Sequence, residues 1–138
     1  MTDTIKTMQQ IWDEAHAAAQ VAMDEMIAKY GYDFGCCGYT SVIIRPARGP
    51  FVKWCKDQIK AAVKAVPANA SSRDHHMGNQ NARMIYGDNH YKGGWEIFGA
   101  GSRNYHGQAL DVKDAAARAF AKVLTDNGIA AHWTSRMD

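Results

Sequence analysis

Cysteine and proline are both scarce in this sequence, with three of each among 138 residues. Two of the cysteines are adjacent, Cys36 and Cys37, and the third is Cys55. An odd number of cysteines at this spacing fits neither a disulfide framework nor a zinc-finger pattern. We therefore expect reduced thiols.

Long apolar runs and an excess of charge of one sign are also missing. No stretch approaches the roughly 18 consecutive apolar residues that a membrane span needs, and the N-terminus lacks the basic start and apolar core of a secretory signal. Lys and Arg number 16 against 14 Asp and Glu, which gives a formal charge of +2 and a pI of about 8.4. We expect a cytoplasmic protein that does not cross a membrane and is not a dedicated nucleic-acid binder.

The length is typical of one domain with one core, so we expect residues 1–138 to form a single domain. Apolar residues recur every three or four positions over residues 4–30, which predicts a long amphipathic helix that ends at Gly31. Because about seven turns exceed the average helix, we expect one end to overhang and to contact a second copy in a homo-oligomer.

Two further helices and several strands are predicted downstream. Aromatic and β-branched residues predict a strand over residues 39–45, and apolar periodicity predicts helices over residues 50–66 and 111–127. Short strands are predicted over residues 83–86, 94–98 and 129–134. Residues 68–81 have no periodicity and predict an exposed loop.

The order of these elements predicts an α+β fold in which the helix of residues 4–30 precedes an α+β core of residues 38–134. We expect a small, mainly antiparallel sheet of three or four strands in a ferredoxin-like, split βαβ arrangement. Right-handed crossovers would place the second and third helices on one face of this sheet. The first helix is then expected to cover the open face or to pack against another subunit.

Three sequence motifs carry a resemblance. They are Cys-Gly-Tyr at residues 37–39, Gly-Gly-Trp-Glu-Ile at residues 93–97 and Ser-Arg-Met-Asp at residues 135–138. With these motifs the chain resembles, over roughly residues 35–138, small uncharacterised proteins encoded by bacteriophages, a family without an established activity. The resemblance implies a location in the cytosol of a bacterial host and an accessory, anti-defence role, such as sequestering a nucleotide signal. It also implies that residues from about 68 to about 90 are an inserted loop.

Residues 99–108 are the densest polar segment without an evident packing role. Glycines there let the backbone approach a ligand, and free amides between a strand and a helix attract anions. We expect Ser102 and Arg103 to contact an anion such as phosphate, Tyr105 or His106 to stack or donate a hydrogen bond, and Gln108 to bind a base edge. The segment matches neither a P-loop nor a dinucleotide motif, and the alternative is a flexible connection.

Three arginines lie near predicted strand ends. Arg45 and Arg48 follow the first strand and Arg136 follows the last one, so the three would form an anion pocket if these ends converge; otherwise they are simply solvated. Trp95 is a stacking candidate if its strand register leaves it exposed.

Metal and catalytic motifs are weak. Asp74, His75, His76 and His90 are of the residue types that bind zinc, but adjacent histidines on a loop rarely converge on one ion. We expect no metal and no cofactor. No nucleophile, base and orienting acid stand in a recognisable order, so no catalytic residue is predicted, and whether the protein is an enzyme stays open.

These observations favour a non-catalytic protein that binds an anionic small molecule, such as a nucleotide, through residues 102–108 and the three arginines. One alternative is an inhibitor or adaptor that presents the first helix or residues 68–90 to a host protein. A second is binding of single-stranded nucleic acid on an aromatic sheet face, which the modest charge and the need to cover the first helix disfavour. A third is a nucleotide-processing enzyme with His106 as general acid or base.

Overall fold

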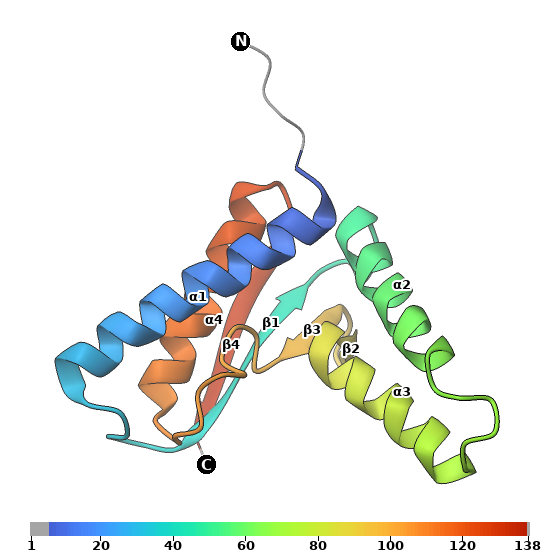
Figure 1. The fold of residues 1–138 in the computed structure, drawn as a ribbon. Coiled ribbons are helices and arrows are strands. Elements are labelled where there is room, and N and C mark those ends of the chain that lie inside the picture. Colours follow the sequence, from blue (N-terminus) through green and yellow to red (C-terminus); the bar gives the residue numbers. More distant parts are fainter. Residues whose placement is uncertain (1–5, 138) are drawn as a thin grey trace.

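A computed structural model describes residues 6–137 of the chain, which form an α+β fold (Figure 1). Its four helices and four strands follow one another as α1 (Met8–Tyr30), β1 (Gly38–Ile44), α2 (Pro50–Lys64), α3 (Ser72–Tyr86), β2 (Asp88–Asn89), β3 (Trp95–Phe98), α4 (Leu110–Asp126) and β4 (Ala131–Met137). None of the helices described is long and apolar enough to cross a membrane.

The four strands form one antiparallel sheet in the order β2-β3-β1-β4. Directly paired residues in antiparallel strands point to the same face. The pairs of Val42 with Ile97 and of Ile44 with Trp95 therefore belong to one face. The pair of Ile43 with Glu96, and that of Ser41 with Phe98, belong to the other face.

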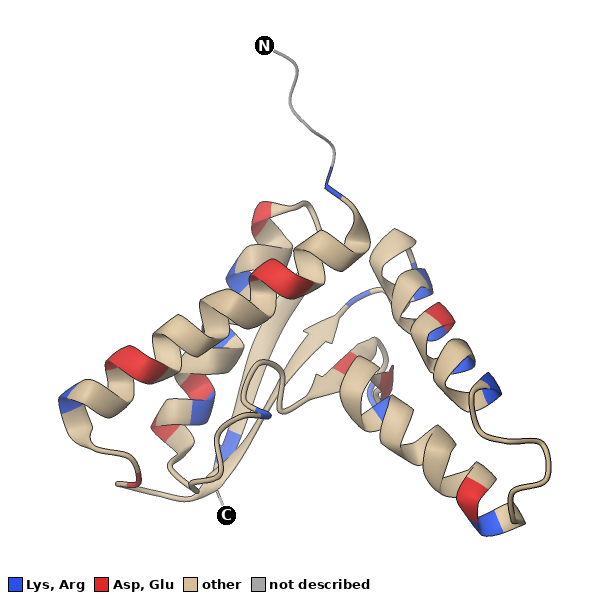
Figure 2. Ribbon diagram, viewed as in Figure 1, with Lys and Arg blue, Asp and Glu red and all other residues tan. Residues whose placement is uncertain are grey.

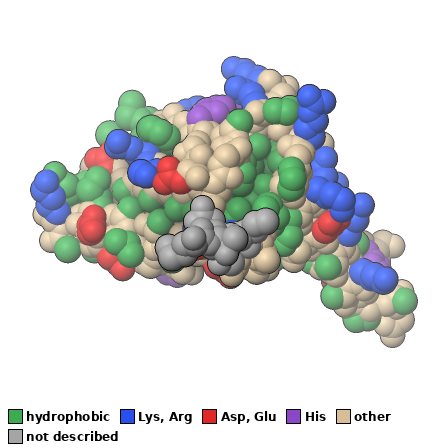
Figure 3. Space-filling model, turned by 90° about the horizontal axis from the view of Figure 1, so that it is seen from above, with side chains coloured by type: hydrophobic (Ala, Val, Ile, Leu, Met, Phe, Trp, Pro, Cys, Tyr) green, Lys and Arg blue, Asp and Glu red, His purple; other side chains and the backbone are tan. Residues whose placement is uncertain are grey.

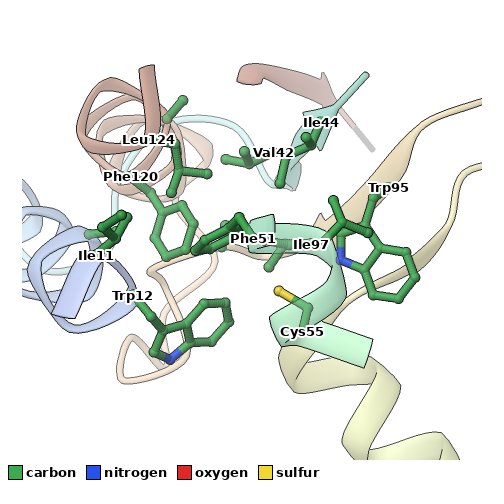
Figure 4. Close-up of a cluster of buried hydrophobic side chains, with 14 of the residues drawn as sticks. Ile11, Trp12, Val42, Ile44, Phe51, Cys55, Trp95, Ile97, Phe120 and Leu124 are labelled. Carbon is green, nitrogen blue, oxygen red and sulfur yellow. The ribbon is translucent and has the colours of Figure 1, made fainter. Parts of the chain in front are cut away.

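All four helices contribute to the core on one face of the sheet. Phe120 and Leu124 of α4 are fully buried and pack with Val42 and Ile44 of β1 and with Phe51 of α2, as the side chains in Figure 4 show. The predicted placement of the second and third helices on one face is thereby confirmed for α2 and α4. The opposite face of the sheet is called the open face below.

The first helix does not cover the open face. It packs along α4, where Ala15 and Ala19 of α1 are fully buried close to Ala116 and Ala117 of α4. Small side chains on both helices let the backbones come close, so α1 buries its apolar stripe against another helix instead of the sheet. The prediction that α1 covers the open face is therefore wrong, and its contact with a second copy stays a prediction.

Residues 68–90 differ most from the expected structure. Residues 72–86 form a helix, α3, where we expected a loop and a strand over residues 83–86. Ser71 begins the helix because its side-chain oxygen accepts a hydrogen bond of 3.1 Å from the amide of Asp74. Ala82 is buried in the core, and Gly87 ends the helix with a φ of 113°. A β-carbon at Gly87 would collide with the Trp95 side chain, so only glycine fits there.

Candidate binding site on the open face of the sheet

The open face carries a hollow of about 460 Å³, called the sheet-face hollow here. Strands β1, β3 and β4 form its floor, and the turn between β2 and β3 forms one wall. Its lining combines aromatic, hydroxyl and charged side chains: Tyr39, Thr40, Ser41, Ile43, Arg45, His90, Tyr91, Lys92, Glu96, Phe98, His132, Thr134, Ser135 and Arg136. Such a mixture suits a ligand that is both anionic and planar.

The strand register explains why these side chains meet. Ser41 lies between Phe98 and Thr134, while Tyr39 lies opposite Arg136. The rings of Tyr39 and Phe98 are 5.9 Å apart between centroids, and each side chain is 44% exposed. Two half-exposed aromatic rings therefore share the open face with hydroxyl groups.

A tight turn walls the hollow at the end of β1. At Gly94 the backbone passes so close to Ile43 and Arg45 that a β-carbon would collide with the Arg45 side chain. The Nε atom of Arg45 donates a hydrogen bond of 3.2 Å to the carbonyl oxygen of Gly93. In the same turn, Tyr91 is 80% exposed and the Lys92 Nζ atom lies 5.3 Å from the centroid of its ring. The turn thus places another aromatic ring and another cation beside Arg45.

The charge of the hollow is mainly positive. Arg45, Lys92 and Arg136 face a single acidic residue, Glu96. Within residues 6–137 the side chain of Arg136 makes no hydrogen bond or ion pair, and Arg45 uses only its Nε atom. Guanidinium groups with unused N–H donors bind carboxylates and phosphates.

Arg45 and Arg136, which the sequence proposed for anion binding, thus line one hollow. Arg48 is exposed on the segment after β1 and is not part of the hollow's lining. Trp95 points into the core and is 3% exposed, and its Nε1 atom donates a hydrogen bond of 3.0 Å to the carbonyl oxygen of Tyr86. That bond fixes the end of α3 against β3.

Residues 102–108 do not line the sheet-face hollow. The hydroxyl of Tyr105, which is 8% exposed, donates to the carbonyl oxygen of Tyr32 at 2.7 Å and accepts from the amide of Ala109 at 3.0 Å. Burial raises the pKa of this hydroxyl. Ser102 donates to the carbonyl oxygen of Gly99 at 2.9 Å. Both side chains stabilise the conformation of the connection between β3 and α4.

Arg103, Asn104, His106 and Gln108 of this connection are exposed. The amide of His106 donates to the hydroxyl of Tyr32, and the amide of Gln108 donates to Asp33. The side chain of Gln108 accepts a hydrogen bond of 3.2 Å from the thiol of Cys37. The backbone amides of His106 and Gln108 are thus used within the protein.

Arg103 lines a second hollow of about 410 Å³ beside α1, called the α1 hollow here, together with His16, Gln20 and Asn104. Its Nη1 atom donates to the carbonyl oxygen of Met84 at 3.1 Å, which ties the connection to the end of α3. The Nε2 atom of His16 is buried and has no hydrogen-bond partner within residues 6–137. Burial lowers the pKa of His16, Asp13 opposes this shift and Arg103 adds to it.

Cys55 is buried, whereas Cys36 is an exposed thiol. Burial raises the pKa of the Cys55 thiol to about 12, so this thiol is protonated and a poor nucleophile at neutral pH. Among residues 6–137, no group of three or more His, Cys, Asp or Glu side chains is placed to hold a metal ion.

Sequence reasoning missed the aromatic residues of the hollow, Tyr39, Tyr91 and Phe98, and also Lys92 and His132. Alternation within a strand was the available signal: residues 39, 41 and 43 share a face, as do residues 132, 134 and 136. Which of these faces the helices would leave open required the tertiary structure.

Comparison with known proteins adds no further information about the site. No family model matches the chain, and no curated protein or solved structure is significantly similar to it.

Proposed function

We propose that the protein binds an anionic ligand with a planar ring, of the nucleotide class, in the sheet-face hollow. One observation carries this proposal: the aromatic pair of Tyr39 and Phe98 lies between two arginines, Arg45 and Arg136, on the face that no helix covers. The ligand is held without a chemical step.

Each part of a nucleotide has a partner in the hollow. A base can stack on the exposed ring of Tyr39 or Phe98, an interaction of about 1–3 kcal/mol per base. A phosphate can accept hydrogen bonds from the guanidinium group of Arg136 or Arg45, and charge-assisted bonds of this kind are about twice as strong as neutral ones. The exposed hydroxyl of Thr134, which lies opposite the buried Ser41 across β1 and β4, suits a sugar.

We also propose that the part of the chain from β1 to β4 is a ferredoxin-like, split βαβ arrangement. In support, the helical pair α2–α3 connects β1 to β2, α4 connects β3 to β4, and β1 lies between β3 and β4 in the sheet. Helices of such a fold gather on one face and leave the other accessible to ligands.

The resemblance to phage-encoded proteins extends the proposal to a biological role. The ligand would be a nucleotide signal of host defence, sequestered in the bacterial cytosol by a homo-oligomeric accessory protein. Sequestration needs only tight binding, which the hollow's mixture of stacking and cationic groups supports.

Calorimetric titration with AMP, UMP and the dinucleotide pApA tests the proposal. We expect saturable binding that is weakened about 10-fold or more by Arg136→Ala or Tyr39→Ala, because each change removes about 1.5 kcal/mol or more of stacking or charge-assisted bonding. Arg48→Ala and Arg103→Ala are the matched controls, since these arginines lie outside the sheet-face hollow, and both should bind as the wild type does.

Two outcomes contradict the proposal. If none of the three ligands binds or raises the melting temperature at millimolar concentration, the hollow is not a nucleotide site. If Arg103→Ala abolishes binding and Arg136→Ala does not, the ligand binds at the connection between β3 and α4 instead of on the sheet.

A further inference from the structure

The charges of this nearly neutral protein are strongly segregated. Residues 45–92 contain nine of the 16 Lys and Arg residues but only three of the 14 Asp and Glu residues. Figure 2 shows the contrast between α2, where basic residues predominate, and α1, where acidic ones do. The overall charge of +2 therefore conceals a basic segment, residues 45–92, in which basic residues outnumber acidic ones by six.

Helix α2 arranges its basic residues as a stripe. Lys53, Lys56, Lys60 and Lys64 follow one another at steps of three or four and are all exposed, which places them on one side of the helix. Of the four, only Lys53 has an ion-pair partner within residues 6–137, namely Asp57. Figure 3 shows Lys and Arg side chains gathered along one flank of the molecule.

The stripe adjoins the sheet-face hollow. Lys56 and Lys60 line a small hollow of about 190 Å³, called the α2 hollow here, which also includes Arg83, Asp88 and Asn89. Asn89 is the last residue of β2, and the next residue, His90, lines the sheet-face hollow. The two hollows thus meet at the end of the edge strand β2, and each of them is lined by cations.

The two arginines of the sheet-face hollow, Arg45 and Arg136, start from backbone positions too far apart for one nucleotide to bridge them. Arg136 pairs with Tyr39 at the start of β1, and Arg45 follows its end. Six residues of extended strand separate these positions, which is about 20 Å at roughly 3.3 Å per residue. A ligand that contacts both arginines through phosphates must contain several nucleotides.

We propose that the natural ligand of the open face is a single-stranded nucleic acid. The strand runs along β1 from Arg136 to Arg45 and stacks unpaired bases on Tyr39 and Phe98. It then continues over the edge of β2 to Lys56 and Lys60. This inference rests on the proposed function and extends it from a nucleotide to a chain of nucleotides. Paired bases in a duplex cannot stack on side chains, so the aromatic face selects single strands.

Fluorescence anisotropy with labelled 12-nucleotide oligouridylate, the oligothymidylate of the same length and UMP as competitor tests the inference. We expect the 12-mers to bind about 100-fold or more tightly than UMP, because each additional stacked base and phosphate contact adds affinity. With Arg45, Arg136, Lys56 and Lys60 each contacting one phosphate, the logarithm of the association constant should fall with the logarithm of salt concentration with a slope of about −3.

Reversing two charges on α2 distinguishes a binding site for a chain of nucleotides from a binding site for one nucleotide. The double variant Lys56→Glu, Lys60→Glu should bind the 12-mer about 10-fold or more weakly with a slope of about −1.4, while UMP binding stays unchanged. The control is Lys29→Glu, Lys122→Glu, which makes the same change in net charge at exposed positions of α1 and α4. It should retain most of the 12-mer affinity.

The possible failures are distinguishable. If UMP and the 12-mers bind with equal affinity and the α2 variant binds both normally, the inference is wrong and the proposed nucleotide site stands. If both double variants weaken the 12-mer equally, or if a duplex of the same length competes as well as a single strand, binding is non-specific attraction and the inference is also wrong. If no ligand binds, both proposals are wrong.

Discussion

Strand β1 shows two different surfaces made by neighbouring residues. Val42 and Ile44 are buried under the helices, whereas Tyr39 and Ser41 belong to the open face. The helix side is filled by apolar side chains, and the open side carries rings, hydroxyls and cations over a hollow. One set of residues of this strand thus stabilises the fold, and the alternating set lines the hollow in which we propose that the ligand binds.

Ile43 refines this comparison because it is buried, as Ser41 is, although it faces the open side. The turn around Gly94 covers it, so an apolar residue there anchors the wall of the hollow. Burial on the open face is therefore local, and it fixes the place where Arg45 and Lys92 meet the sheet.

Phe120→Ala should have the largest effect on stability. The ring is fully buried and packs edge-to-face with Trp12 and His16, and removing a buried aromatic ring costs about 3–5 kcal/mol. Urea denaturation measures the change in the free energy of unfolding. Tyr39→Ala, the matched aromatic deletion on the open face, should change that free energy by no more than about 1 kcal/mol while it weakens ligand binding. Equal losses of stability in the two variants would mean that the open face is part of the core.

Tyr105→Phe should have an intermediate effect. The change removes only the hydroxyl that joins Tyr32 to Ala109 and leaves the buried amide of Ala109 without its partner, at a cost of about 1–3 kcal/mol. Thermal unfolding followed by circular dichroism detects the loss. Tyr32→Phe serves as control, because the amide of His106 that it leaves unpaired is exposed and can bind water. Unchanged stability together with lost nucleotide binding in Tyr105→Phe would show that Tyr105 is a ligand contact after all.

The smallest expected effect concerns pH. Burial holds the pKa of His16 below its usual value of 6.5, so the unfolded chain takes up a proton at His16 more readily than the folded protein does. This contribution lowers stability as the pH falls from above 6.5 toward the lowered pKa, and it is absent above that range. His16→Gln should therefore lose less stability than the wild type between pH 7.5 and pH 5 in parallel melting experiments. An identical pH dependence in both proteins would contradict the assignment.

Much of the fold follows from local sequence signals. The predicted helices of residues 4–30, 50–66 and 111–127 correspond to α1, α2 and α4, and the predicted strands of residues 39–45, 94–98 and 129–134 correspond to β1, β3 and β4. The first helix begins at Met8, later than predicted. Thr7, which we expected inside the helix, is its N-cap, because its side-chain oxygen accepts a hydrogen bond of 3.1 Å from the amide of Gln10. Residues 1–5 lie outside the described part of the chain. Periodicity is a property of the chain itself, which is why these elements were predictable.

Helix α3 shows where local signals mislead. Met84, Ile85 and Tyr86 have the composition of a strand, but they form the last turn of a helix whose Ala82 is buried in the core. Ser71 and Asp74 at capping distance and Gly87 at the end were the signals for a helix. Few apolar residues in the segment made its period too weak to recognise, and contact with α2 and β3 decided the conformation.

The candidate site also combines features that the sequence predicts with features that depend on the tertiary structure. The sequence by itself determined that Arg45 follows a strand, that Tyr39 alternates with the core residues of β1, and that lysines recur along α2. The prediction that Arg136 follows the last strand was wrong, because β4 continues to Met137 and pairs Arg136 with Tyr39. Only the tertiary structure decided that α1 packs on α4 and leaves one face of the sheet open, that Trp95 faces the core, and that residues 102–108 bond to residues 32 and 33. An amphipathic pattern indicates that the apolar face of a helix or strand must be buried. Which element it packs against depends on the fit between surfaces that are distant in the sequence.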